Sequence, residues 1–287
     1  DFVSVWQLPC LDKVWVLPLP SSVEPGPCLS RFLNEVDLSG STKLKALGSE
    51  AFLRSALTKI VLPSGLQKIG ARCFYSCDRL TDVSLNKGLK DVGENCFSYC
   101  DSLTTITVPE SVRFVGEGCF THCENLSQVT LPSQLTALQK NTFHQCYTIQ
   151  SIVLPSGLQE IGARCFCSCV ILTTVEVPPL VETIHGEAFA YCSNLKSIIF
   201  KEESELTTVH EGAFAHCAAL TTITFPSSFT NIGLHDPFGG CTGLTTVTLL
   251  AEKLEYTIGR TKINNRVIEA PEDGNNPNEL KAGDVTL

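Results

Sequence analysis

Residues Leu103–Cys123 read LTTITVPESVRFVGEGCFTHC, and this stretch recurs with small changes along most of the chain. The copy before it, Leu80–Cys100, reads LTDVSLNKGLKDVGENCFSYC, and the copy after it, Leu126–Cys146, reads LSQVTLPSQLTALQKNTFHQC. Self-similarity at one fixed period is the sequence signature of an architecture built from stacked repeats. The fold therefore follows from this repeat.

When the repeats are aligned, equivalent positions form columns. One column of cysteines gives the period most clearly, because its members are 23 residues apart five times and then 25 and 24 apart. A phenylalanine three residues earlier keeps the same spacing. The strand column continues backwards through Ile60 and Val36 to Val14, which makes about ten turns. The cysteine column consists of Cys77, Cys100, Cys123, Cys146, Cys169, Cys192, Cys217 and Cys241.

Each part of the repeat predicts a local structure. The segment L-T-x-V-x-L alternates apolar and polar residues and is rich in β-branched types, so it predicts a short strand with one buried face. The proline that often follows ends the strand. Two apolar positions further on, such as Leu158 and Ile161, predict a tight turn or a second short extended segment. The F-x-x-C segment predicts one helical or 3₁₀ turn on the opposite side.

Stacking such units in parallel, at roughly 4.8 Å per turn, buries a continuous core that no single unit could form. The predicted domain organisation has three parts. Residues 1–32, with Trp6 and Trp15, form an N-terminal cap, and residues 33–250 form the solenoid. Residues 251–287 contain a fading last turn, a C-terminal cap and a flexible tail.

The net charge of −9 argues against a nucleic-acid partner, since phosphate contacts need a basic stripe. No run of eighteen apolar residues occurs, so the sequence encodes no transmembrane segment of its own. It also contains no phosphate-binding loop and no G-x-S-x-G motif. These features predict no enzyme, no cofactor and no metal.

The fifteen cysteines are best explained as buried thiols that pack in every turn and donate weakly to backbone carbonyls. Disulfides between neighbouring turns remain an alternative. A zinc site is disfavoured, because no histidine column accompanies the cysteines. Cys167 occupies a variable column and is the thiol we expect to be exposed, and Cys10 is the other candidate for special behaviour.

Two histidines precede members of the cysteine column, giving His122–Cys123 and His216–Cys217. A Cys–His nucleophile needs a third group that orients the base, and none recurs with these pairs. Catalysis by either pair is therefore not predicted.

The outward positions of the strands form a small, hydroxyl-rich and nearly uncharged face. Such a face can contact a protein or a glycan without desolvating many charges, although threonine is also simply a good residue for an exposed strand. The candidate binding residues are Thr105, Thr107, Thr130, Thr174, Glu176, Thr222, Thr224, Thr246 and Thr248.

Two departures from the period are candidates for contact with a specific partner. A two-residue insertion carries Glu202, Glu203 and Glu205, and a longer turn carries His235 and Asp236. The simpler interpretation of the glutamates is a solvated loop.

The segments LTTITVPESVRFVGEGCFTHC and LTTITFPSSFTNIGLHDPFGGC (Leu220–Cys241) resemble the BspA-type, or Treponema pallidum-type, leucine-rich repeat over about residues 33–250. The resemblance implies a leucine-rich-repeat solenoid and a non-enzymatic adhesion or recognition protein at a cell surface or outside the cell. Its partner would be a protein, with a glycan as an alternative. The many reduced thiols also fit a second hypothesis, an intracellular scaffold or accessory subunit of a larger complex.

Overall fold

The computed structural model describes residues 34–232 and 236–250, together with the backbone of five short strands outside these ranges. The chain forms two compact units, the first made of Asp1–Leu135 and Asn141–Thr148, the second of Thr136–Lys140 and Ile149–Leu287. Most of the predicted cap and tail, including Trp6, Cys10 and residues 251–261, lies outside the described residues, so the three-part domain organisation stays a prediction.

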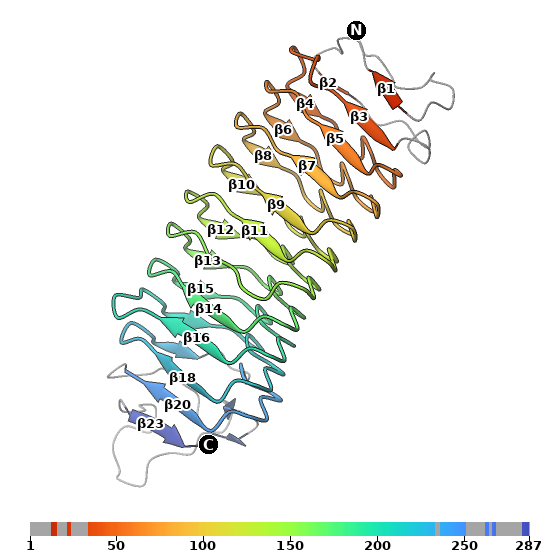
Figure 1. Cartoon of the computed structure of the whole chain (residues 1–287). Helices are drawn as coiled ribbons and strands as arrows, with labels where there is room; N and C mark the ends of the chain where they lie inside the picture. Colours follow the sequence, from red (N-terminus) through yellow and green to blue (C-terminus); the bar gives the residue numbers. More distant parts are fainter. Residues whose placement is uncertain are drawn as a thin grey trace. The chain divides into compact units, whose positions relative to one another are not determined.

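The first unit consists of stacked turns that carry two parallel ladders (Figure 1). Residues pair one period apart, so that Ile106 lies opposite Val129. The first ladder, on what we call the strand-side face, contains β1 (Lys13–Trp15), β3 (Glu35–Asp37), β5 (Lys59–Val61) and β7 (Asp82–Ser84), and then the pair β9 (Thr105–Thr107) and β11 (Gln128–Thr130). The second ladder contains β2 (Ser22–Val23), β4 (Ala46–Leu47), β6 (Lys68–Ile69), β8 (Asp91–Val92) and β10 (Phe114–Val115).

The second unit repeats this plan. Its strand-side face contains β14 (Thr174–Val177), β16 (Ser197–Phe200), β18 (Thr222–Phe225), β20 (Thr246–Leu249) and β23 (Gly283–Thr286). Its second ladder contains β12 (Ala137–Leu138), β13 (Glu160–Ile161), β15 (Thr183–Ile184), β17 (Thr208–Val209) and β19 (Asn231–Ile232). β23 pairs antiparallel with β20 and so covers the hydrogen-bonding edge that β20 would otherwise leave open. β21 (Lys262–Ile263) and β22 (Arg266–Val267) pair antiparallel with each other.

These ladders confirm the predicted solenoid and its short strands with one buried face. In β9 the central Ile106 is buried, while Thr105 and Thr107 on either side are exposed. The second apolar pair of each repeat forms a second short strand, as in β13, where Ile161 is fully buried. Alternation along each strand therefore assigns every second residue to the core.

A stack of phenylalanine rings fills the core on the turn side of each unit. In the first unit Phe52, Phe74, Phe97, Phe120 and Phe143 follow one another with ring centroids 5.2–5.7 Å apart and planes within 10°. In the second unit Phe166, Phe189, Phe214 and Phe238 do the same within 12°. Each ring thus packs on the ring of the turn before and the turn after it, in the offset geometry that aromatic pairs prefer.

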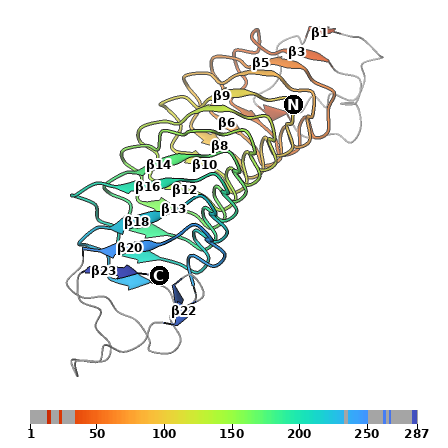
Figure 2. The ribbon, with the colours of Figure 1, turned by 60° about the horizontal axis from the view of Figure 1, so that its bottom comes forward.

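The F-x-x-C segments differ from the helical or 3₁₀ turns expected of them, because the described residues contain no helix. In one such segment the N–H groups of Arg72, Phe74 and Ser76 donate to carbonyl oxygens one turn later, at 2.7–2.9 Å, while the Cys77 N–H returns to the Phe74 carbonyl at 3.1 Å. Arg72 and Ser76 both have φ of 55°. A helix needs successive N–H groups that donate within the same segment. Here residues with positive φ, and N–H groups that donate to the next turn, interrupt that series. Figure 2 shows these turn segments stacked along the side away from the strands.

The cysteine column acts as predicted, because its thiols donate to backbone carbonyls. The Cys100 thiol, for example, lies 3.2 Å from the Phe74 carbonyl oxygen of the preceding turn. All thirteen described cysteines are buried and unbridged. Among the described residues this column is therefore a set of buried structural thiols.

Candidate interaction surface

The histidine–cysteine neighbours point in different directions. Cys123 is fully buried and donates to the Phe97 carbonyl oxygen, whereas the His122 ring stacks on Tyr99 at a centroid distance of 4.3 Å. Burial raises the pKa of the Cys123 thiol to about 12, so the thiol stays protonated and is a poor nucleophile. In the second unit His216 stacks on Tyr191 in the same way, at 4.5 Å. Neither pair has the geometry of a nucleophile with its base.

Acidic side chains do not gather at a site that could hold a metal either. Within residues 34–232 and 236–250, no group of three or more histidine, cysteine or carboxylate side chains converges on a point that could bind an ion. The described residues therefore offer no metal centre.

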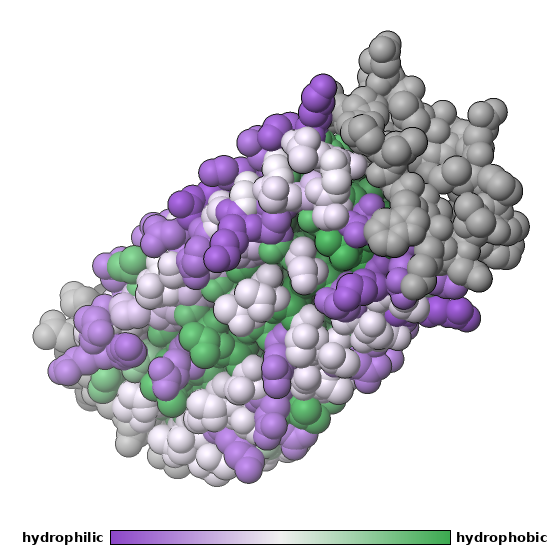
Figure 3. Space-filling model, turned by 45° about the horizontal axis from the view of Figure 1, so that its top comes forward, coloured by the Kyte–Doolittle hydropathy of each residue, from purple (hydrophilic) through white to green (hydrophobic). Residues whose placement is uncertain are grey.

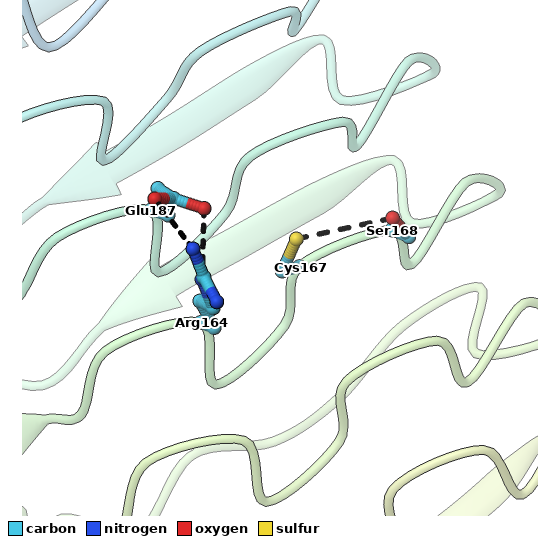
Figure 4. Close-up of polar contacts among 4 residues, drawn as sticks. All are labelled: Arg164, Cys167, Ser168 and Glu187. Atoms are coloured by element: carbon cyan, nitrogen blue, oxygen red, sulfur yellow. Dashed lines mark hydrogen bonds and ion pairs between the residues drawn. The ribbon is translucent and has the colours of Figure 1, made fainter.

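Cys167 is buried, with 4% of its surface exposed, so the expectation of an exposed thiol was wrong. Two other small side chains of its column, Ser98 and Ala190, are fully covered as well. Figure 4 shows Cys167 beside Ser168 and near Arg164, whose guanidinium makes two bonds of 2.9 and 3.0 Å to Glu187 on the next turn. Burial raises the pKa of the Cys167 thiol.

The predicted binding residues of the first unit lie where the sequence placed them. Thr105, Thr107 and Thr130 are exposed on the strand-side face. Their hydroxyl groups make no hydrogen bond within the described part of the chain. The hydroxyl just before the strand behaves differently: in Thr81 it donates to the Thr58 carbonyl oxygen at 3.1 Å, and the same bond recurs in other turns. The strand hydroxyls are thus the ones left for a partner.

A groove of about 670 Å³ opens over β7 and β9 on this face. Its lining includes the aliphatic Val83 and Val108 and the strand hydroxyl groups of Ser84, Thr105, Thr107 and Thr130. Charged side chains line it as well, namely Asp82, Lys87 and Glu110. This volume lies within the range of about 300–1,000 Å³ that is typical of ligand sites.

Two of the groove's carboxylates are held in place. Asp82 pairs with Lys59 at 3.1 Å, and one oxygen of Glu110 accepts bonds from the backbone N–H and hydroxyl of Ser133 at 3.0 and 2.9 Å. The hydroxyl of Ser111, which also lines the groove, is buried without a hydrogen-bond partner. A buried polar atom without a partner marks a place where a ligand or water is expected.

The strand-side face of the second unit is different in character. Val153 is 85% exposed and Ile199 is 42% exposed, and Glu176 lies between them in the register of the ladder. Of the predicted residues, Glu176 is exposed, and so are Thr222 and Thr224. Thr174 is half-buried and accepts a bond from the Ser197 hydroxyl at 3.2 Å, and Thr246 and Thr248 are half-buried.

A hollow of about 380 Å³ lies beside these aliphatic side chains, lined by Val153, Glu176, Pro179 and Lys201. The Glu202–Glu205 insertion follows directly after Lys201, and the Glu205 N–H donates to the Pro179 carbonyl at 2.7 Å. The insertion is therefore tied to the rim of this hollow. Glu202, Glu203 and Glu205 all expose their side chains.

At the second irregular turn, Asp236 is half-buried, and one of its carboxylate oxygens accepts the Phe238 N–H at 2.8 Å. His235 lies outside the described residues. Asp236 thus has a structural role within its own turn.

Sequence reasoning missed several residues at these two places. Ile199 occupies an outward position of β16, and Val153 lies two residues after the isolated bridge residue Ser151. Their apolar character was the signal that could have singled them out. Lys87 and Glu110 lie in the segment that follows the strand. In that segment the repeat pattern indicates only where the strand ends and gives no signal for a binding residue. The face drawn in Figure 3 has the same mixed character, with hydrophobic surface lying among polar side chains.

The comparisons with known proteins agree with this geometry. The sequence profile described as "BspA type Leucine rich repeat region" matches residues 45–173 and 159–269, with six copies. Among curated proteins none matches the chain. No helix in the described part of the chain is long and apolar enough to cross a bilayer.

Solved structures of leucine-rich repeat proteins are also similar. A leucine-rich repeat protein from Bacteroides ovatus has 22% identity and a TM-score of 0.49, over 79% of this chain and 76% of that one. A leucine rich cell surface protein from Faecalibacterium prausnitzii has 23% identity and a TM-score of 0.49, over 78% and 76%. The T. pallidum leucine-rich repeat protein has 25% identity and a TM-score of 0.43, over 56% and 83%.

Proposed function

Because the chain belongs to the BspA-type leucine-rich repeat family, we propose that it is a non-enzymatic adhesion protein that binds a protein partner on its strand-side face. Proteins of this kind are modules that bind through stacked repeats. The proposal names the second unit as the place of contact and a cell-surface or extracellular setting as its context.

The observation that carries the proposal is the exposure of Val153 and Ile199 on a face whose other outward positions are polar. Aliphatic side chains gain roughly 25 cal/mol for each Å² removed from water, so a partner that covers them is stabilised. Next to them lie the hollow and the charges of Glu176 and Lys201. An apolar centre with a polar rim is the usual anatomy of a protein interface.

Affinity capture from the native source, with quantitative mass spectrometry, tests the proposal. We expect Val153→Thr combined with Ile199→Thr to lose the proteins that the unaltered chain captures. Ile171→Thr is the matched control, because Ile171 is 39% exposed, close to the 42% of Ile199, but lies in the turn that precedes β14. Equal capture by the control and the double variant would show that the strand-side face is not the binding surface.

A scaffold or accessory subunit is the second candidate, favoured by the thirteen buried and unbridged thiols. Free cysteines suit a reducing compartment better than an oxidising one. The same capture experiment separates the two functions, since a subunit co-purifies with fixed partners in whole-number ratios, whereas the partners of an adhesion protein are captured in no fixed ratio.

A further inference from the structure

The groove over β7 and β9 differs chemically from the aliphatic hollow of the second unit. In the described part of the first unit the large apolar side chains that stay exposed are Tyr99 and Phe114, and neither lines the groove. Interfaces between proteins usually depend on a few aromatic or large apolar anchors. The aliphatic residues that do line it, such as Leu85 and Val108, are not among the exposed large apolar side chains.

What the groove offers is hydrogen bonding. Ser84, Thr105, Thr107 and Thr130 present hydroxyl groups that each donate one hydrogen bond and accept others. Turns repeat at about 4.8 Å, and alternate residues of a strand are about 6.7 Å apart, so the hydroxyls form a grid. A ligand that is itself dense in hydroxyl groups can satisfy such a grid, because each of its groups can also both donate and accept.

The two carboxylates of the groove determine which groups of a ligand can bind beside them. Ser133 engages one oxygen of Glu110, and this fixes the carboxylate while its second oxygen has no contact within the described residues. Asp82 is likewise oriented by Lys59. Carboxylates only accept hydrogen bonds, so both select donors such as hydroxyl groups. With Lys59 at Asp82 and Lys87 in the lining, the two carboxylates meet two ammonium groups, so the groove has no net charge that would attract a charged ligand.

We propose that this groove binds a neutral oligosaccharide. The inference rests on the proposed function in one respect, that the strand-side face is the binding surface, and it assigns a separate ligand to the first unit. The groove's volume suits a short chain of rings.

A glycan array probed with the full chain tests the proposal, using neutral, sialylated and sulfated oligosaccharides. Neutral glycans are expected to bind and anionic ones to bind less well. Thr107→Val keeps the side-chain shape but removes the hydroxyl, and Glu110→Gln removes the charge. Each is expected to weaken binding of the neutral glycan by about tenfold, the effect of one good hydrogen bond.

Thr224→Val is the matched control, because Thr224 is an exposed threonine at the corresponding strand position of the second unit. It should leave glycan binding unchanged, as should Val153→Thr with Ile199→Thr. Absence of neutral-glycan binding, or an equal loss in Thr107→Val and Thr224→Val, would overturn the proposal. Loss of captured protein in Thr107→Val without glycan binding would also overturn it, since the groove would then accept a protein segment. Failure of the double variant to lose protein partners would count against the proposed function alone.

Discussion

The thiol of Cys123 donates a hydrogen bond to the backbone carbonyl oxygen of Phe97, one turn earlier, across an S···O distance of 3.0 Å. The same carbonyl also accepts the Cys100 N–H at 3.2 Å. The cysteine therefore joins two turns through a backbone group that a smaller apolar side chain could not reach. This contact explains why the column keeps a thiol instead of an alanine.

Replacing Cys123 by alanine should lower the free energy of unfolding by about 1–3 kcal/mol, through a lost donor and a small cavity. Cys123→Ser should lose less, because a hydroxyl also donates and Ser55 holds the equivalent position of an earlier turn. Urea unfolding of the two variants measures the difference. Identical midpoints for Cys123→Ala and the unaltered chain would show that the thiol contributes nothing.

The phenylalanine stack predicts that removing a buried ring lowers the free energy of unfolding far more than removing an exposed one. Phe120 is fully buried between Phe97 and Phe143, so Phe120→Ala should cost about 3–5 kcal/mol. Phe114→Ala is the control of the same chemistry, because Phe114 is 47% exposed, and it should cost less than about 1 kcal/mol. Hydrogen exchange should locate the loss of protection in the turns next to Phe120. Similar losses in both variants would contradict the role of the stack.

Glycine at position 116 is required by the close approach of two backbones. A Cβ atom there would lie 2.4 Å from the Glu94 backbone nitrogen, so Gly116→Ala should destabilise the chain by about 1–3 kcal/mol or more. At Gly40 a Cβ atom would meet nothing within 4 Å, and Gly40→Ala should change stability by less than about 0.5 kcal/mol. Thermal unfolding measures the stability of both variants. An equal loss of stability in Gly116→Ala and Gly40→Ala would contradict the explanation by close backbone approach.

Asp101 gives a prediction for pH dependence. Burial, followed by the nearby carboxylates of Glu124 and Asp78, raises the pKa of Asp101, although His122 opposes the shift. A raised pKa in the folded state means that the protonated form is favoured there, so stability is lost as the pH rises from the unfolded pKa of about 3.9 through the folded value. Asp101→Asn should therefore be more stable than the unaltered chain at pH 7.

The advantage of Asp101→Asn should shrink as the pH falls to about 3, because the aspartic acid is then protonated in both states. Urea midpoints measured at both pH values test this. A constant difference between the two chains across the range would rule out titration of Asp101 as its source.

Most of the fold was predictable because the period determines the register. Once Ile106 and Val129 stand one period apart in the same column, parallel pairing between them follows, and so does the buried side of each strand. The donor role of the cysteine column was predictable for the same reason, since a residue kept in every turn must act between turns.

The turn geometry was not predictable in the same way. Left-handed φ angles occur at Arg72, Ser76 and Tyr99, residue types that do not favour them, so composition gave no signal there. The structure shows that the need for hydrogen bonds between turns outweighs the local preference of these residues. The exposure of Cys167 was mispredicted because a variable column was equated with an exposed one.

The candidate sites were predictable only in outline. Thr105 and Thr107 were found because they follow the strand alternation, whereas Lys87 and Glu110 become neighbours of the groove through the path of the segment after the strand. That path depends on contacts between turns, such as the bonds from Ser133 to Glu110, which the pattern of one repeat does not contain.

The turn-side hydrogen bonds have a direction. In each unit the backbone N–H groups of residues such as Phe74 and Phe189 donate to the following turn, whereas the cysteine thiols donate to the preceding one, so each kind of donor keeps a single direction along the stack. A turn therefore meets the same pattern of donors and acceptors whichever neighbour it is placed beside. Duplicating or deleting a whole internal turn leaves that pattern intact, while a partial turn breaks it. The number of turns can accordingly vary in evolution by whole repeats, without redesign of the remaining sequence.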